Sequence, residues 1–364
     1  MSMNKEIIQK RIRAVRRELS NRNIDCLIVT KPANVTYTTG FLGDDSWAVI
    51  TRGKVYFLTD SRYTEQARVE CQDCTIVERG DLMAEAAGKL VKKLKSVQTV
   101  TVEKSLSLAE FGALKKHVKA RIRSVANVIE TIRGIKDGTE IKAVEIAASI
   151  AAQALEQTLS HIKPGMTESE LAGMLDFQIR KLGATNSFET IVAFGPNASR
   201  PHHQPGGKKL KQKDTVLIDF GAKYKGYCSD ITRCFIAGRR EAFYKKVYDV
   251  VEQAQGAAIK KIKAGVKMKD VDAAARTVIK DNDLPVYGHG TGHGLGLEIH
   301  ESPFLKVQSK GTLKAGQVIT IEPGIYIPGK LGVRIEDDVL VTEGGCRILT
   351  RKCPHSPLLL NSKG

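Results

Sequence analysis

The chain has 364 residues, enough for two domains that each bury a core, and its hydrophobic content is 42%. No apolar run approaches the ~20 residues that a membrane-spanning helix needs. The formal net charge is +17, but the basic residues are scattered over many expected helices. We therefore expect a solvated cationic surface, with neither a nucleic-acid partner nor a membrane partner.

The N-terminal segment and the cysteines indicate a cytoplasmic protein. The N-terminal segment is charged and amphipathic, and it lacks the apolar core of a signal peptide. The seven cysteines are odd in number and scattered, which favours reduced thiols over a disulfide framework. Cys71 and Cys74 form a CxxC motif, but no second pair stands at the spacing of a zinc ribbon.

The first 130 residues predict a small α/β domain, because helical and strand-like segments alternate. The expected helices are Lys5–Asn21, Tyr63–Glu70, Asp81–Lys95 and Leu108–Val118. The expected strands are Cys26–Thr30, Ala48–Thr51, Val55–Thr59, Thr99–Val102 and Val125–Val128, of which the second and third form a hairpin. This region contains no glycine-rich phosphate loop, so nothing indicates nucleotide binding.

A linker at Ile132–Thr139 leads into a second domain with two pairs of helices. The first pair is expected at Glu140–Ile162 and at a helix that ends at Gly183 and begins with a capping box of Thr167 and Glu170. The second pair is expected at two later segments, Glu241–Lys263 and Lys269–Asn282.

The segment Thr215–Phe235 brings two aspartates near each other. Strand-forming residues run up to Asp219, a polar turn is expected at Ala222–Gly226, and a second strand is expected at Tyr227–Ile236. Paired strands lie about 5 Å apart, so Asp219 can approach Asp230, which interrupts the second strand. An aspartate at a strand end is usually a turn former, but two adjoining carboxylates repel unless a cation lies between them.

The second half of this domain repeats the first. The sequence LKQKDTVLIDFG matches LKAGQVITIEPG, and this match aligns Asp219 with Glu322. The strands that follow carry Asp230 and Glu336, and the helical segments upstream match in the same order. We therefore expect a pseudo-symmetric site of four carboxylates on one central sheet.

Two loops are rich in histidine. PNASRPHHQP contains His202 and His203, and the glycine-rich YGHGTGHGLGLEIHESP contains His289, His293 and His300. Its alternate glycines allow close backbone approach and unusual φ angles. A single histidine is more often structural than a metal ligand, but three in such a loop, in a chain with four unpaired carboxylates, indicate a metal site.

The expected metal ligands are Asp219, Asp230, His293, Glu322 and Glu336. Four carboxylates and one imidazole are a suitable ligand set for two divalent ions. Carboxylates and a hydroxide would bridge the two ions. Manganese or cobalt is favoured, with zinc or iron as alternatives, because structural zinc prefers thiolates. Two such ions, about 3.5–4 Å apart, lower the pKa of a bridging water.

The motifs IDFGAKYKGYCSDITR, HGTGHGLGLEIHE, ITIEPGIYIPG and GVRIEDDVLV resemble the M24 metallopeptidases, and most of all their Xaa-Pro branch, aminopeptidase P and prolidase. The resemblance implies an α+β fold over the whole chain. A creatinase-like N-terminal domain would span residues 1–132, and a pita-bread catalytic domain with an internal duplication would span residues 133–364. It also implies hydrolysis of the bond before proline in peptide substrates, usually by a homodimer.

The family's five metal ligands fall on the five residues named above. The resemblance adds His202, His289 and His300 as histidines on the substrate side. His300 and His202 would hydrogen-bond the carbonyl oxygen and the oxyanion, and Glu322 would accept a proton. Of the doubled histidines, His202 is preferred to His203 because it directly follows a proline, as in the family pattern.

Arg334 is a further feature of the proline-specific branch. It stands two residues before Glu336, and we expect it to orient Glu336 and the neighbouring acids rather than to bind substrate. A structural ion pair is the simpler interpretation of this arginine.

The choice between two peptidase types stays open at this point. Aminopeptidase P-like cleavage of Xaa-Pro-Yaa peptides is preferred, because the catalytic domain has no insertion that would close over a dipeptide's carboxylate. Dipeptidase activity is the alternative, and a non-catalytic pita-bread binding protein is a remote one. In a dimer the loop Phe41–Trp47 could wall the partner's site, or Trp47 could instead pack into its own core.

Overall fold

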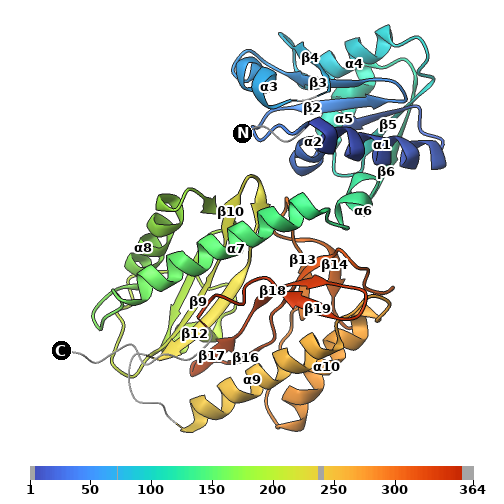
Figure 1. The fold of residues 1–364 in the computed structure, drawn as a ribbon. Coiled ribbons are helices and arrows are strands. Elements are labelled where there is room, and N and C mark those ends of the chain that lie inside the picture. The colour runs from blue at the N-terminus through green and yellow to red at the C-terminus, as the bar shows by residue number, and fades with distance from the viewer. Residues whose placement is uncertain (1–4, 72, 237–241, 355–364) are drawn as a thin grey trace. The chain divides into compact units, whose positions relative to one another are not determined.

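The structure is a computed structural model that describes residues 5–71, 73–236 and 242–354. The first four residues lie outside the described residues. So does Glu241, the expected first residue of the helix Glu241–Lys263. The chain divides into two compact units, of which the first ends at Arg133 and the second begins at Gly134 (Figure 1). Within the described ranges, no helix combines the length and the apolar character needed to cross a membrane.

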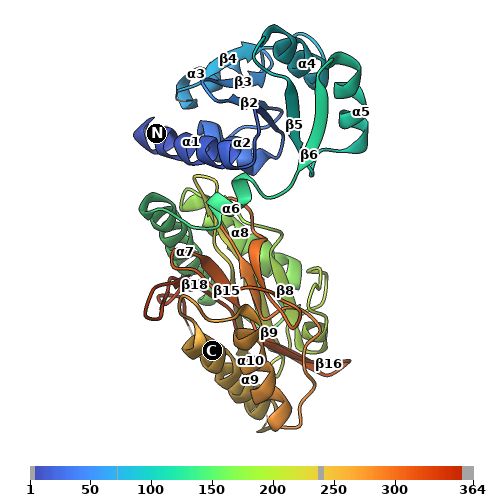
Figure 2. The ribbon, with the colours of Figure 1, turned by 90° about the vertical axis from the view of Figure 1, so that its right-hand side faces the viewer.

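The first unit is a mixed sheet with helices on both of its faces (Figure 2). In the spatial order β4-β3-β2-β1-β5-β6, its strands are β4 (Thr75–Glu78), β3 (Val55–Thr59), β2 (Trp47–Thr51), β1 (Cys26–Val29), β5 (Thr99–Glu103) and β6 (Arg121–Val125). Its helices are α1 (Lys5–Asn21), α2 (Pro32–Thr39), α3 (Thr64–Glu70), α4 (Met83–Lys93), α5 (Leu108–His117) and α6 (Ile129–Arg133). Strand β1 lies inside the sheet, which explains why all four of its residues are apolar and buried.

The sequence predicts most of this unit, with three differences. The β2–β3 hairpin is confirmed. The strand expected at Val125–Val128 instead ends at Val125, because β6 pairs with β5 over Arg121–Val125. Helix α2 and strand β4 were missed; α2 is buried on nearly all sides and so has no amphipathic pattern.

Trp47 packs its side chain into the core of its own unit. It begins β2, pairs with Leu58 and is only 5% exposed. Phe41, at the other end of the same loop, is fully buried against Phe57. The interpretation in which Trp47 packs into the local core is therefore correct.

The second unit places its strands between two pairs of helices (Figure 1). The helices are α7 (Gly138–Leu159), α8 (Glu168–Lys181), α9 (Ala242–Lys261) and α10 (Met268–Asp281). The Thr167–Glu170 capping box is confirmed. A second box of Asp137 and Glu140 starts α7, so the predicted linker already contains the start of this helix and the end of α6.

The strands of this unit form separate sheets, so the expectation of one central sheet is wrong: the two halves of the duplication each build their own. One sheet is β12 (Ile231–Ile236), β9 (Thr215–Phe220) and β8 (Ile191–Phe194), and another is β14 (Glu301–Leu305), β13 (Gly292–Gly294), β15 (Val318–Ile321), β18 (Asp337–Val341) and β19 (Cys346–Ile348). The smaller ones are β11 (Tyr227–Cys228), β10 (Ala222–Tyr224) and β7 (Thr185–Asn186), and the pair β16 (Gly324–Ile327) and β17 (Leu331–Arg334).

The internal duplication is confirmed in the strand order and in the hydrogen bonds. The order β8-β9-β12 in one half corresponds to β13-β15-β18 in the other. Gly165 donates its backbone N–H to Leu210 O, and Gly265 does the same to Leu313 O, at the start of each repeat. The two halves therefore fold alike, and they bring equivalent positions to the middle of the unit.

The hairpin around the two aspartates differs from the prediction in one respect. Asp219 lies inside β9, where it pairs with Thr232, and Asp230 lies in the break between β11 and β12. The expected turn at Ala222–Gly226 narrows to Lys225 and Gly226, because β10 occupies the preceding residues. Both turn residues have positive φ, 49° and 84°, as a two-residue hairpin turn of type I′ requires.

Candidate metal centre

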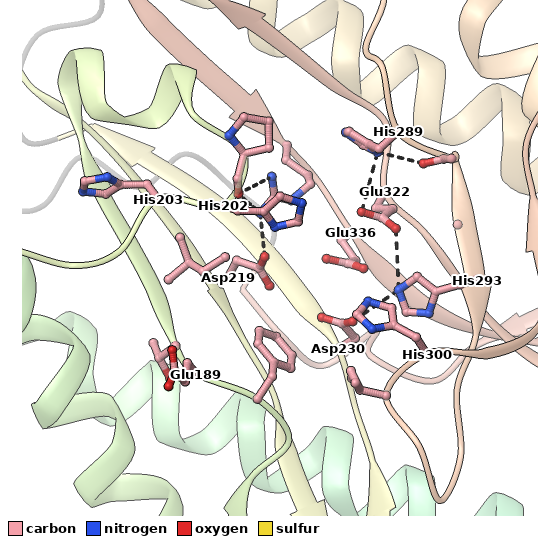
Figure 3. Close-up of a pocket in the computed structure, with 18 of the residues that line it drawn as sticks. Glu189, His202, His203, Asp219, Asp230, His289, His293, His300, Glu322 and Glu336 are labelled. Atoms are coloured by element: carbon pink, nitrogen blue, oxygen red, sulfur yellow. Dashed lines mark hydrogen bonds and ion pairs between the residues drawn. The ribbon is translucent and has the colours of Figure 1, made fainter. Parts of the chain in front are cut away.

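The expected site residues lie together around one cavity of about 690 Å³ (Figure 3). It is lined by all the expected metal ligands and by the histidines and the arginine of the predicted site: Asp219, Asp230, His293, Glu322, Glu336, His202, His289, His300 and Arg334. His203 also borders the cavity, but its ring points away from the carboxylates in Figure 3.

The duplication explains how four carboxylates reach one place. Asp219 lies near the end of β9, and Glu322 directly follows the equivalent strand β15. Asp230 lies in the break between β11 and β12, and Glu336 lies in the equivalent break between β17 and β18. The backbone N–H of Glu336 donates to Thr232 O at 3.2 Å, which ties the two breaks together.

The carboxylates of the site lie close together, and burial strengthens the repulsion between their negative charges. Burial and the negative charges of Glu336 and Asp219 raise the pKa of Asp230 well above its ordinary value. Burial, with Glu322 and Asp219 nearby, raises the pKa of Glu336 in the same direction. Burial raises the pKa of Glu322 to about 8, and Asp219 adds to the effect. Without cations, these groups can become neutral only by taking up protons.

The donor set fits divalent cations. One ligand atom each from Asp230, His293 and Glu336 lies within 4.8 Å of the other two. His293 Nε2 stands 3.6 Å from Asp230 Oδ2 and 3.6 Å from Glu322 Oε1. Asp219 Oδ1 is buried without a hydrogen-bond partner among the described residues. Oxygen donors with one imidazole are a set that first-row divalent ions accept.

The glycine-rich loop holds His293 by close backbone packing. A Cβ on Gly292 would lie 1.9 Å from Thr320 O, so only glycine lets β13 approach β15 this closely. The expectation of unusual φ angles is wrong, because none of the loop's glycines 288, 290, 292, 294 and 296 has a positive φ. Thr320 Oγ1 accepts the N–H of His293, and burial with the neighbouring His300 lowers the pKa of His293 to about 4.

A network from α10 holds His289. Arg276 donates to the backbone carbonyls of Tyr287 and His289, at 2.8 and 2.6 Å, and it pairs with Asp272. Asp272 in turn accepts the hydroxyl of Thr291. The ring of His289 is bonded to the hydroxyl of a tyrosine on β16 at 3.0 Å. Burial lowers the pKa of His289 to about 4, so this imidazole is neutral at pH 7.

The other histidines differ in their surroundings. The His300 ring lies 4.4 Å from the His293 ring, centroid to centroid, and burial lowers its pKa. The His202 ring turns toward the carboxylates (Figure 3). His203 Nε2 instead lies 2.9 Å from Glu168 Oε2, and that glutamate is fully buried at the start of α8. This contact gives His203 a structural partner away from the site.

Arg334 pairs with Asp219 rather than directly with Glu336. Its Nη2 donates to Asp219 Oδ2, and its Nε donates to Thr232 Oγ1 at 3.0 Å. Thr232 Oγ1 then donates to Glu336 Oε2 at 2.6 Å. The arginine therefore reaches Glu336 through one hydroxyl, and it is only 3% exposed.

Comparison with known proteins identifies the family. Residues 142–343 match the model described as metallopeptidase family M24, and residues 11–135 match the creatinase/prolidase N-terminal domain. The chain belongs to metallopeptidase family M24. The family resemblance and the predicted fold, a creatinase-like N-terminal domain before a pita-bread domain, are thereby confirmed.

Relatives of this M24 peptidase match along almost its whole length. It is 42% identical over 337 residues to the uncharacterized peptidase YqhT of Bacillus subtilis, covering 92% of this chain and 94% of that protein. The Xaa-Pro dipeptidase from Bacillus anthracis superposes with a TM-score of 0.91 at 38% identity, covering 96% and 99% of the two chains. The X-Pro aminopeptidase from Thermotoga maritima gives 0.86 at 36% identity, covering 93% and 99%.

Sequence reasoning missed two polar residues that support the site of this M24 peptidase. The hydroxyl of Tyr326 forms a hydrogen bond with the ring of His289 and accepts one from Arg334. Its signal lay in the motif ITIEPGIYIPG, where a tyrosine follows Glu322 by four residues on the next strand. Thr232 lies inside the motif SDITR and bridges Arg334 to Glu336, but nothing in its spacing distinguished it from a strand-forming threonine.

Proposed function

We propose that this M24 peptidase hydrolyses the peptide bond before proline, with two divalent ions held by Asp219, Asp230, His293, Glu322 and Glu336. The observation that carries the proposal is the cluster of buried carboxylates around one imidazole, which is electrostatically unfavourable without cations. The similarity to proteins named as Xaa-Pro peptidases supports the choice of bond.

The same donor set favours manganese or cobalt, with zinc or iron as alternatives. When bound, two such ions supply Lewis acidity and lower the pKa of a water molecule toward neutrality. Of the residues proposed to hold them, His293 is fixed by Thr320, and Asp219 is fixed by Arg334. Partners of this kind set the orientation of a ligand and tune its basicity.

The remaining residues have roles that follow from their protonation and position. His300, whose pKa is lowered by burial, is neutral at pH 7 and keeps one N–H that can donate to the carbonyl oxygen of the substrate. His202, on the other side of the cavity, can donate to the same developing charge. Glu322 accepts the proton that the attacking water releases, since its carboxylate faces the cavity.

Proline is accommodated by the apolar part of the cavity. A bond to proline is a tertiary amide without an N–H, so a groove that binds that donor would gain nothing. The wall here instead offers four apolar side chains against which a pyrrolidine ring can pack: Phe188, Ile191, Ile299 and Phe304. Burying the ring there is favourable by about 25 cal/mol for each Å² removed from water.

We place aminopeptidase P-like cleavage of Xaa-Pro-Yaa peptides first, because a cavity of about 690 Å³ is large enough for more than a dipeptide. Chain length does not discriminate, since a protein named dipeptidase and one named aminopeptidase both match over nearly their full length. One observation favours the dipeptidase alternative: the ammonium group of Lys306, which lines the cavity, could bind a free carboxylate. The homodimer implied by the family resemblance also stays a prediction.

The direct test uses metal-depleted protein assayed with Gly-Pro and Arg-Pro-Pro, before and after addition of manganese or cobalt. We expect chelator to abolish hydrolysis, and manganese or cobalt to restore it better than magnesium, which prefers octahedral oxygen ligation. Arg-Ala-Pro serves as the control, because its second residue is not proline. Hydrolysis that is undiminished in excess chelator would contradict the metal mechanism, and no hydrolysis with any metal would favour a binding protein.

A further inference from the structure

A buried ion pair lies behind the histidine side of the cavity. Lys136 Nζ contacts Glu301 Oε1, and the two side chains are 1% and 6% exposed. Lys136 belongs to the stretch that the sequence indicated as a linker, and its backbone N–H donates to Gly316 O at 2.8 Å. The lysine is therefore fixed at both its backbone and its side chain.

This pair fills the inside of the loop that joins β13 to β14. A Cβ on Gly296 would lie 3.0 Å from Glu301 Oε1 and 3.1 Å from Lys136 Cε. Cys228, which precedes Asp230 by two residues, donates its backbone N–H to Gly296 O at 2.8 Å. The ion pair thus packs against Gly296, the residue whose carbonyl is hydrogen-bonded to the strand that leads to Asp230.

Glu301 is the chain neighbour of His300, at the first position of β14. The side chain of Glu301 is buried outside the cavity lining, whereas His300 lines the cavity, so the two neighbouring side chains diverge where the bend enters β14. Glu301 also pairs with Gly294 across a bulge next to His293. The position of one carboxylate consequently sets the direction of the loop that carries both histidines.

We propose that Lys136 is a positioning residue that holds His300 toward the substrate through its buried ion pair with Glu301. Removal of the ammonium group would leave a buried carboxylate without its cationic partner, and hydration of that carboxylate would displace the start of β14. His300 would then lose its alignment while the metal ligands remain in place. This role rests on the proposed function of His300.

The test is a double-mutant cycle of Lys136→Met and His300→Ala, assayed with an Xaa-Pro peptide in the metal-loaded protein. We expect Lys136→Met to lower kcat about 10–100-fold, a smaller loss than the roughly 10²–10³-fold expected when the oxyanion donor itself is removed. The KM and the metal content should change little. In the His300→Ala background, Lys136→Met should lower kcat less than about 2-fold, because the two changes affect one interaction. Equal losses in both backgrounds would overturn the proposal.

Lys136→Arg is the conservative variant, since it keeps the charge, and it should recover most of the activity that Lys136→Met loses. Recovery no better than in Lys136→Met would argue against the ion pair. If Lys136→Met does not fold, Glu301→Gln removes the other charge at constant size and enters the same cycle.

A readout independent of activity separates this inference from the proposed function. In the metal-depleted protein, Lys136→Met should shift the NMR ring signals of His300, assigned with His300→Ala, and leave those of the exposed His161 unchanged. Unchanged His300 signals would overturn the positioning role. A wild-type protein without Xaa-Pro hydrolysis would contradict only the proposed function, and the ring signals would still decide the role of Lys136.

Discussion

Arg334 donates a hydrogen bond from Nη2 to Asp219 Oδ2, a carboxylate 115 residues earlier in the chain. The arginine ends β17 in the second half of the duplication, and the aspartate lies in β9 of the first half. The same guanidinium reaches Tyr326 and, through Thr232, Glu336. One cation thus restrains acids from both halves, and in the described part of the chain it leaves Asp219 Oδ1 without a hydrogen-bond partner.

Replacement of Arg334 by methionine should lower both metal content and kcat. Without the guanidinium, Asp219 loses the hydrogen bond that orients it, and we expect a loss of roughly 10–100-fold in metal affinity or activity. The conservative variant Arg334→Lys should give an intermediate loss, since an ammonium keeps the charge but not the planar fork. Elemental analysis and kcat measured together check this, and wild-type values in Arg334→Met would assign the arginine no role in the site.

Asp230→Ala should abolish activity and reduce bound metal, because the site then loses one of its five proposed ligands and with it part of the affinity for the cations. The measurement is the metal-to-protein ratio after dialysis, together with Xaa-Pro hydrolysis. Asp281→Ala is the matched control, since this aspartate is exposed at the end of α10. Full metal loading and wild-type rates in Asp230→Ala would contradict the proposed dinuclear site.

The two neighbouring histidines should separate in their effects. His293→Ala should lower metal content and kcat together, because its Nε2 faces both Asp230 and Glu322. His300→Ala should lower kcat by roughly 10²–10³-fold, the usual effect of losing one oxyanion donor, with little change in metal content. If His300→Ala instead emptied the site, the division between ligand and hydrogen-bond donor would be wrong.

The sequence predicted the arrangement of the site because the duplication supplies long-range information that local patterns lack. Aligning Asp219 with Glu322, and Asp230 with Glu336, related residues that are distant in the chain, and the structure brings all four to one cavity. Strands interrupted by a carboxylate were a visible signal, since Asp230 breaks an otherwise regular run of strand formers.

The contacts that support the site were not predictable in this way. The direct pairing of Arg334 with Asp219 depends on how β17 packs beside β9, and the sequence predicted only that the arginine orients Glu336 and neighbouring acids. Lys136 lies in a segment with turn-like composition, and nothing local indicates that its ammonium group is buried against Glu301. Such pairs are set by tertiary packing, which a periodicity or a motif does not encode.

The metal-free protein should lose stability as the pH rises from about 6.5 to about 8. The pKa of Glu322 is raised to about 8 in the folded protein. Its contribution to the free energy of unfolding is therefore complete below pH of about 4.3, the ordinary pKa of a glutamate, and is lost as the pH rises to about 8. Asp230 and Glu336, whose pKa values are also raised, act in the same direction. His289 and His293, with pKa values lowered to about 4, act oppositely, but their effect is complete above about 6.5.

For Glu322 alone the expected loss over this window is about 2 kcal/mol in the free energy of unfolding. Urea unfolding at pH 6.5 and 8 measures it, in chelator and in saturating manganese. With manganese the loss should vanish or reverse, because metal binding favours deprotonated ligands. Glu322→Gln is the control and should flatten the metal-free dependence. A metal-free stability that rises over this window would show that the carboxylates are not protonated together.

Lys306 should decide how strongly the enzyme accepts dipeptides. Ser302, Phe304 and Lys306 are exposed at alternate positions at the end of β14, and the last two line the cavity with the proposed ligands. The Lys306 ammonium lies 5.9 Å from the centre of the Phe304 ring, so it stands beside the apolar wall proposed for proline. In a bound Xaa-Pro dipeptide, the free carboxylate is attached to the pyrrolidine ring, so it would lie near this cation.

The measurement is kcat/KM for Gly-Pro and for Arg-Pro-Pro in the wild type and in Lys306→Met. If Lys306 binds the dipeptide carboxylate, the variant should lose roughly 10–150-fold on Gly-Pro, through KM, since a hydrogen bond between charged groups contributes about 1.5–3 kcal/mol. The loss on Arg-Pro-Pro should be smaller, because its proline carbonyl carries no charge. Lys310→Met, a change at a lysine outside the cavity lining, controls for a general effect of net charge. Release of arginine from Arg-Pro-Pro by the wild type supports aminopeptidase P-like activity, and cleavage of Gly-Pro alone would make the enzyme a prolidase.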